Sequence, residues 1–164
     1  MKSVATKRIG KDLRLLLEDV KAHGNNNSNS SNSDPLVVSV DSESVYQWRV
    51  VAKPPTSSVY NSTSTGTTYE LSVIFSEDYP HEPPTVRFLT AVYSPLVTPE
   101  GEVCERLIGA DWSPAQHAAD AILLVLNKVF RDYKNSIDED VHPEARTCLE
   151  TAPQEFASRA RRGH

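Results

Sequence analysis

The sequence has few cysteines and no long apolar run, and each shortage excludes a class of protein. Its 164 residues contain only Cys104 and Cys148, too few for a disulfide scaffold and without C-x-x-C spacing. No stretch approaches the roughly 18 consecutive apolar residues that a membrane-spanning helix needs, and the charged N-terminus carries no apolar signal segment. We therefore expect no membrane insertion and a cytoplasmic location, with the nucleus, or recruitment to an organelle surface by a partner, as alternatives.

Excess positive charge, glycine-rich motifs and paired histidines are also lacking. The net charge is −5 and the pI is near 5.5, so no overall basic field favours nucleic acid. The six glycines form neither G-x-G-x-x-G nor a P-loop. The five histidines have no metal-ligand spacing with one another or with cysteine. We expect no nucleic-acid partner, no bound metal and no cofactor.

Hydrophobic periodicity predicts helices at both ends of the chain and strands between them. One helical stripe runs over residues 4–22 and stops at Gly24, and a second runs over 116–133. Pro143 and Pro153 each sit where a short helix would begin. Runs of β-branched and aromatic residues between turn signals predict four strands, Leu36–Val40, Tyr46–Val51, Tyr69–Phe75 and Thr85–Phe88. Their short connections favour an antiparallel meander, in an α+β fold with the helices on one face of the sheet.

A polar tract follows the first helix. Residues 25–34 consist only of Asn, Ser and Asp, and such a composition cannot bury apolar area. The chain length fits one hydrophobic core. We expect a single domain over residues 1–164, with a flexible Asn/Ser loop at 25–34.

Cys104 differs in its surroundings from an ordinary lone cysteine, which is a small buried apolar group. It lies in the segment 95–111, which has neither a helical nor a strand period and which we expect to be irregular. Charged neighbours indicate that its thiol is accessible, and a thiol is the best side-chain nucleophile near neutral pH. Cys104 is therefore a candidate nucleophile. Cys148, on an expected helix, keeps the ordinary interpretation.

The residues around Cys104 form a recognisable pattern. The element Gly101-Glu102-Val103-Cys104 is followed, eight residues beyond the cysteine, by Trp112-Ser113-Pro114-Ala115. This pattern resembles the ubiquitin-conjugating enzyme family, whose active segment reads His-Pro-Asn, then G-x-[IV]-C, then W-S-P-A. Further matches in family order are Lys7-Arg8-Ile9, Lys11-Asp12-Leu13, Trp48, Tyr79–Pro84 and Val141–Ala145.

The resemblance implies the ubiquitin-conjugating (UBC) fold and two successive acyl transfers. Cys104 would accept ubiquitin or a ubiquitin-like protein from an activating enzyme, then pass it to a lysine of a protein substrate or to the cysteine of a ligase. The acidic residue that the family places near the attacking lysine would be Asp138 or Glu139. The resemblance implies no cofactor.

The resemblance also implies where partners bind, through the first helix and two loops. Lys7, Lys11 and Arg14 form a basic stripe on the helix, although a charged helix face is as often only solvated. Pro114-Ala115 matches one ligase-contact loop. His81 stands where many members carry Phe, so the usual hydrophobic anchor for a ligase is missing.

Two positions depart from the family pattern. Ser94 and Leu96 stand where His-Pro-Asn has His and Asn, and a leucine side chain has no donor for the oxyanion of a tetrahedral intermediate. Either a backbone N–H or Thr98 substitutes, or direct attack by lysine is slow and transfer to a ligase cysteine is favoured.

These departures leave two other classes open. One is a catalytically inactive UBC variant that binds ubiquitin or a partner conjugating enzyme without forming a thioester. The other is a Cys-His hydrolase that uses His117 or His142, although no flanking signature of such an enzyme is present.

Overall fold

The computed structural model describes residues 3–25, 35–61 and 68–163. The expected Asn/Ser loop therefore lies outside the described residues, apart from Asn25, which ends the first helix. The elements are α1 (Val4–Asn25), β1 (Leu36–Ser44), β2 (Gln47–Lys53), β3 (Tyr69–Ile74), β4 (Thr85–Phe88), α2 (Glu105–Gly109), α3 (Ala118–Phe130), the 3-10 turn η1 (Ile137–Glu139), α4 (Pro143–Thr151) and α5 (Pro153–Arg162). No described helix is both long and apolar enough to cross a membrane.

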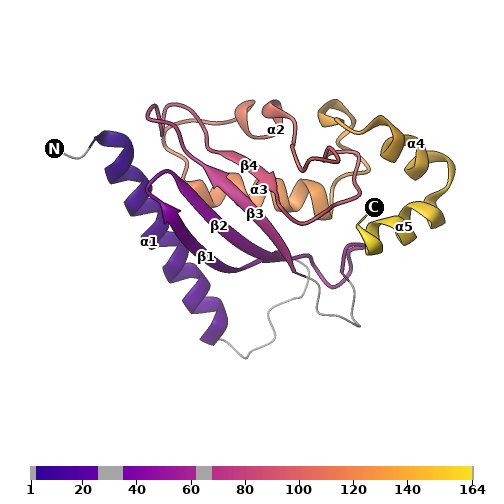
Figure 1. The fold of residues 1–164 in the computed structure, drawn as a ribbon, viewed down its shortest axis with the longest axis horizontal. Helices are drawn as coiled ribbons and strands as arrows, with labels where there is room; N and C mark the ends of the chain where they lie inside the picture. The colour runs from indigo at the N-terminus through magenta and orange to yellow at the C-terminus, as the bar shows by residue number, and fades with distance from the viewer. Residues whose placement is uncertain (1–2, 26–34, 62–67, 164) are drawn as a thin grey trace.

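The four strands form one antiparallel sheet in the order β1-β2-β3-β4. In Figure 1, α1 runs beside β1, α3 passes behind the strands, and α4 and α5 lie at the other end of the molecule. This arrangement confirms the predicted α+β meander and matches the UBC fold. The strand β1 is longer than predicted, with register shifts at Val37/Ser39 and Ser42/Ser44, because bulges interrupt the alternation on which the prediction relied.

The core lies between the sheet and α3. Alternate side chains of β2 and β3 are fully buried, among them Trp48, Val50, Leu71 and Val73. The helix α3 is apolar on nearly all sides, as expected of a helix covered by other elements. Near its end Phe130 packs against aromatic rings from three other segments, Tyr60, Tyr69 and Phe88. This core fixes the sheet edge and the segments that carry the candidate site.

Several boundaries differ from the sequence prediction. The segment 95–111 is not wholly irregular, because it contains α2, whose five residues are too few to show a helical period. The helix α3 is shorter than 116–133, since the backbone N–H of His117 is capped by the carboxylate of Asp120 at 2.8 Å. The predicted starts at Pro143 and Pro153 are confirmed.

The buried face of α1 also differs. It contains Ala5, Ile9, Asp12 and Leu16, whereas Leu17, which falls at helical spacing within the predicted stripe of residues 4–22, is 38% exposed. The buried face therefore includes a carboxylate that hydrophobic periodicity cannot reveal.

Candidate active site

Cys104 lies at the start of α2, where the backbone changes from extended to helical. It has φ −60° and ψ 132°, and its carbonyl oxygen accepts a hydrogen bond from the N–H of Leu107 at 3.0 Å. Leu107 and Ile108 are buried and anchor the helix to the core. Cys104 itself is partly exposed. Its thiol is therefore carried by a fixed backbone rather than by a free loop.

A tight turn from Thr98 to Glu102 leads into Cys104. The Thr98 N–H donates to the Glu102 carbonyl oxygen at 2.9 Å, and the Glu102 N–H donates to the Thr98 hydroxyl oxygen at 3.0 Å. Gly101 has φ +91°, and a Cβ there would collide with the carbonyl oxygen of Phe88 on β4. The glycine of the G-x-[IV]-C element thus allows the turn to lie against the sheet, and the Thr98 hydroxyl oxygen acts within that turn as an acceptor.

A pocket of about 460 Å³ opens beside Cys104. Residues 82–86, which lead into β4, line it together with residues 103–105, Ile108 and Gly109. Prolines, valines and Ile108 supply apolar surface, and Glu82 and Glu105 supply exposed carboxylates. The candidate nucleophile therefore adjoins a concave surface with both apolar and acidic groups.

Ser94 and Leu96, the two departures from His-Pro-Asn, are fully buried. The Ser94 hydroxyl oxygen accepts a hydrogen bond from the N–H of Leu96 at 3.2 Å. The carbonyl oxygen of Pro95 accepts from the N–H groups of Val141 and His142 at 2.9 and 3.0 Å. This segment is thus pinned to the loop before α4, and the leucine side chain belongs to the core.

The two acidic candidates both lie in the short turn η1, but they differ in their contacts. Arg106, two residues after Cys104, donates to the backbone carbonyl oxygen of Asp138 at 2.9 Å, which ties η1 to the start of α2. The Asp138 side chain is exposed. The Glu139 carboxylate lies 3.9 Å from the Lys128 ammonium on α3. The turn carrying both residues is therefore linked to the Cys104 region, with the Glu139 side chain directed toward a cation.

A buried polar network, not anticipated from the sequence, joins α1 to the segments around it. Asp12 accepts hydrogen bonds from the Tyr79 hydroxyl, from Arg8 Nε at 3.1 Å and from the Ala118 N–H at 3.0 Å. His117 Nδ1 lies 2.8 Å from the same carboxylate, which only accepts, so this nitrogen carries the hydrogen. Burial opposes ionisation of Asp12, but these hydrogen bonds outweigh it and hold its pKa below the usual range.

The network brings together the surfaces expected to bind partners. Arg8 donates to the carbonyl oxygens of Pro114, at 2.8 Å, and of Gln116, and Trp112 Nε1 donates to the Pro80 carbonyl oxygen at 2.8 Å. The start of α1, the loop of His81 and the W-S-P-A loop are therefore connected. The predicted partner residues Lys7, Lys11, Arg14, His81, Pro114 and Ala115 are all exposed. The partly exposed Arg8 and the buried Asp12, which make these connections, lie within two of the matched motifs, but their roles became visible only in the structure.

Neither histidine proposed for a hydrolase is hydrogen-bonded to Cys104 within the described part of the chain. His117 is engaged with Asp12, and the rings of His142 and Tyr93 pack edge to face with centroids 5.5 Å apart. Cys148 is partly buried on α4, with its thiol 4.0 Å from the Ala152 carbonyl oxygen. In the described ranges no group of three His, Cys, Asp or Glu residues is arranged to hold a metal ion.

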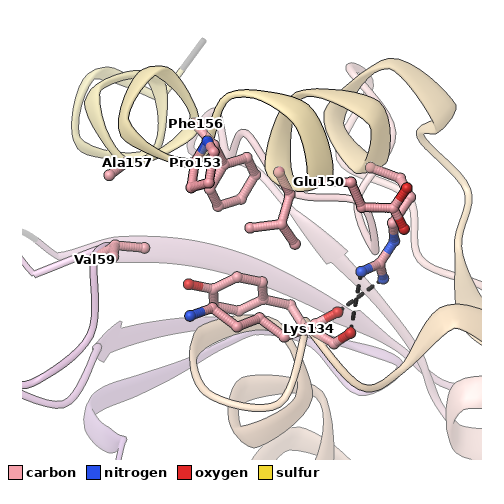
Figure 2. A pocket seen from close by; sticks show the side chains of 9 residues that line it. Val59, Lys134, Glu150, Pro153, Phe156 and Ala157 are labelled. Carbon is pink, nitrogen blue, oxygen red and sulfur yellow. Dashed lines mark hydrogen bonds between the residues drawn. The ribbon is translucent and has the colours of Figure 1, made fainter.

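A second pocket, of about 340 Å³, lies between the C-terminal helices and the segment after α3. Figure 2 shows Pro153 and Phe156 of α5 on one side of it and Val59 and Lys134 on the other. The guanidinium of Arg146 in its wall is already bonded to the Asp140 carboxylate and to the carbonyl oxygens of Tyr133 and Lys134. That guanidinium therefore fastens the loop before α4 rather than presenting an anion site.

The fold and the cysteine-centred site together define a class of protein with an antiparallel sheet, a central helix and an accessible cysteine after a glycine turn. A comparison with known proteins identifies this class. A family model described as "Ubiquitin-conjugating enzyme" matches residues 15–164, and the chain belongs to the ubiquitin-conjugating enzyme family.

The similar proteins are described as enzymes that conjugate ubiquitin or NEDD8. The solved structure "Ubiquitin conjugating enzyme (putative) from Trypanosoma cruzi" shares 53% sequence identity at a TM-score of 0.89, covering 98% of this chain and 99% of that one. The "Probable ubiquitin-conjugating enzyme E2 31" of Arabidopsis thaliana is 29% identical over 121 residues, 74% of each chain. The "NEDD8-conjugating enzyme ubc12" of Schizosaccharomyces pombe is 32% identical over 96 residues, which are 58% of this chain and 52% of that protein.

Proposed function

We propose that this chain accepts ubiquitin or a ubiquitin-like protein as a thioester on Cys104 and transfers it to a substrate lysine or to a ligase cysteine. The observation that carries the proposal is the position of Cys104. It is a partly exposed cysteine that begins α2 after the Gly101 turn, in the wall of a pocket, in a chain of this family.

The chemistry is a pair of acyl exchanges. The Cys104 thiolate attacks the carbonyl carbon of the activating enzyme's thioester, and that enzyme's cysteine leaves as a thiolate. An acceptor amine, or a ligase thiolate, then attacks the carbonyl of the Cys104 thioester, and the Cys104 thiolate leaves. An attacking ammonium must lose its proton first. We assign the acid near the incoming lysine to Asp138, with Glu139 as the alternative.

The remaining assignments follow from the same proposal. The exposed basic stripe of α1 and the His81 and Pro114-Ala115 loops would receive the activating enzyme and the ligase. Residues 1–164 would form one UBC domain working in the cytoplasm, or in the nucleus or at an organelle surface when recruited there by a partner. Because His81 replaces the usual hydrophobic anchor, we expect weak binding to ligases that rely on it.

The inactive UBC variant is the second candidate, and the buried Leu96 and Ser94 favour it. Incubation with an activating enzyme, ATP and a panel of ubiquitin-like proteins separates the two. We expect one modifier to form an adduct with the chain that disappears on treatment with a thiol. Binding of ubiquitin without any such adduct, across the whole panel, would establish the inactive variant instead.

A further inference from the structure

The charged residues that line the pocket beside Cys104 are all acidic. Glu82 and Glu105 lie among its lining residues, and no lysine, arginine or histidine does. Within the described residues neither carboxylate forms an ion pair, and Glu82 accepts one hydrogen bond, from the Ser76 hydroxyl at 3.0 Å. The pocket is therefore acidic, and its carboxylates retain capacity for a cationic ligand.

The two arginines that adjoin lining residues in sequence, Arg87 and Arg106, do not pair with these carboxylates. Arg87, on the same face of β4 as the lining residue Thr85, directs its Nε to the Glu100 carbonyl oxygen at 3.0 Å. Arg106 donates to the Asp138 carbonyl oxygen, as described above. Both guanidinium groups are held on backbone oxygens and lie outside the pocket lining.

We propose that this pocket receives a short cationic segment of the acceptor protein, next to the lysine that attacks the Cys104 thioester. The inference rests on the proposed function and names the class of substrate for that site. A volume of about 460 Å³ holds a few side chains rather than a folded domain. Pro83, Pro84, Val86 and Ile108 would contact the aliphatic stems of Lys or Arg, while the carboxylates bind their charged ends. An acceptor protein has a charge complementary to that of the acidic pocket, because the lysine that reacts is a cation until it loses its proton.

The acceptor preference is measured with the loaded full-length enzyme in single-turnover discharge. The acceptors are short peptides with one central lysine that is flanked by Arg, Ser or Glu. A parallel set of peptides has a central cysteine in place of the lysine. We expect the half-saturating concentration to be about tenfold lower for Arg than for Glu flanks at low salt, with a similar maximal rate, and the preference to shrink as salt screens the charges.

The variant E82Q/E105Q should reduce this preference to about twofold or less. The matched control is E70Q. Glu70 is an exposed carboxylate at the end of the β3–β4 ladder that is farthest from Thr85. It should keep the preference. Equal use of all peptides, or a preference that survives E82Q/E105Q, would overturn the proposal. Slower charging in E82Q/E105Q with unchanged peptide preference would assign the pocket to the modifier and would also overturn it.

A second measurement needs no thioester, so it separates failure of this inference from failure of the proposed function. In a Cys148→Ser background, the Cys104 thiol is modified by a cationic and by an anionic alkylthiosulfonate. Relative to a small model thiol, we expect the cationic reagent to be favoured about fivefold, and E82Q/E105Q to remove most of that factor. A reagent ratio equal to that of the model thiol would contradict the acidic pocket whether or not the chain can be charged.

Discussion

At the scale of single residues, the buried position of Leu96 bears most on the mechanism. The sequence predicts that Leu96 stands at the position of the family's oxyanion donor, and the structure places the leucine side chain in the core. The Thr98 hydroxyl, the other substitute considered, accepts a hydrogen bond from the Glu102 N–H within its own turn, which leaves its O–H able to donate. Both substitutes therefore stay open, a backbone N–H near Cys104 and the Thr98 hydroxyl.

We predict that discharge of the loaded enzyme onto free lysine is slow, and that L96N with S94H accelerates it by up to about a hundredfold, the effect typical of one oxyanion donor. Discharge onto a small thiol should change much less. Because both positions are buried, the variant will be less stable, so rates are compared where circular dichroism shows it folded. L96M, which adds no donor, is the control. Rapid lysine discharge by the natural enzyme that slows in the double variant would contradict this prediction.

Asp12 gives a prediction about stability and pH. In D12N one amide oxygen replaces two carboxylate oxygens that accept four hydrogen bonds, so we expect the free energy of unfolding to fall by about 3 kcal/mol. The pKa of Asp12 is lowered in the folded state, so its stabilisation is full above its unfolded pKa of about 3.9 and is lost as pH falls through the lower folded value. Urea unfolding should show a D12N deficit that is constant above about pH 5 and shrinks in acid. A deficit that persists unchanged to the lowest pH would disprove this role.

At the scale of elements, the sequence predicted most of the fold because most elements carry a period. The strands β2, β3 and β4, the helix α3 and the proline-started α4 and α5 each follow from alternation, helical spacing or a proline at the first turn. The short elements α2 and η1 do not, since three to five residues cannot display a helical period. The hydrogen bond from Arg106 that joins these two could not be predicted, because it connects residues 32 positions apart through a backbone oxygen.

That hydrogen bond gives the element-scale prediction. R106A should loosen η1 and slow discharge onto lysine by about tenfold, the value of one hydrogen bond from a charged group, while charging by the activating enzyme stays the same. D138N should slow the same step. If Arg106 acts by positioning Asp138, the double variant should be little slower than D138N alone. Fully additive effects, or equal slowing of the charging step, would show that Arg106 does not act through Asp138.

At the scale of the whole molecule, the polar network around Asp12 links the first helix to two loops that are distant in sequence. Arg8 and Asp12 reach Tyr79, Pro114 and His117. The matched sequence motifs contain these residues. Hydrophobic periodicity, however, does not reveal that a single carboxylate on the apolar face of a helix is buried and hydrogen-bonded. The sequence could thus propose a site at Cys104, where the motif is local, but could not predict the network, where the contacts are long-range.

The Asn/Ser tract gives a prediction for the entire domain. Shortening residues 26–33 to a few residues should leave the melting temperature and the charging rate nearly unchanged, because loop-closure entropy changes slowly with length. Differential scanning calorimetry and a charging time course measure the two quantities. A large fall in either would show that the tract packs against the domain or binds a partner.

The central claim is that Cys104 alone carries the modifier, and site-directed variants in a charging assay test it most directly. With the activating enzyme and ATP, the natural chain and C148S should form the same thiol-sensitive adduct. C104A should form none, and C104S should form either none or an adduct that resists thiols, since an oxyester replaces the thioester. Charging that survives in C104A would contradict the account.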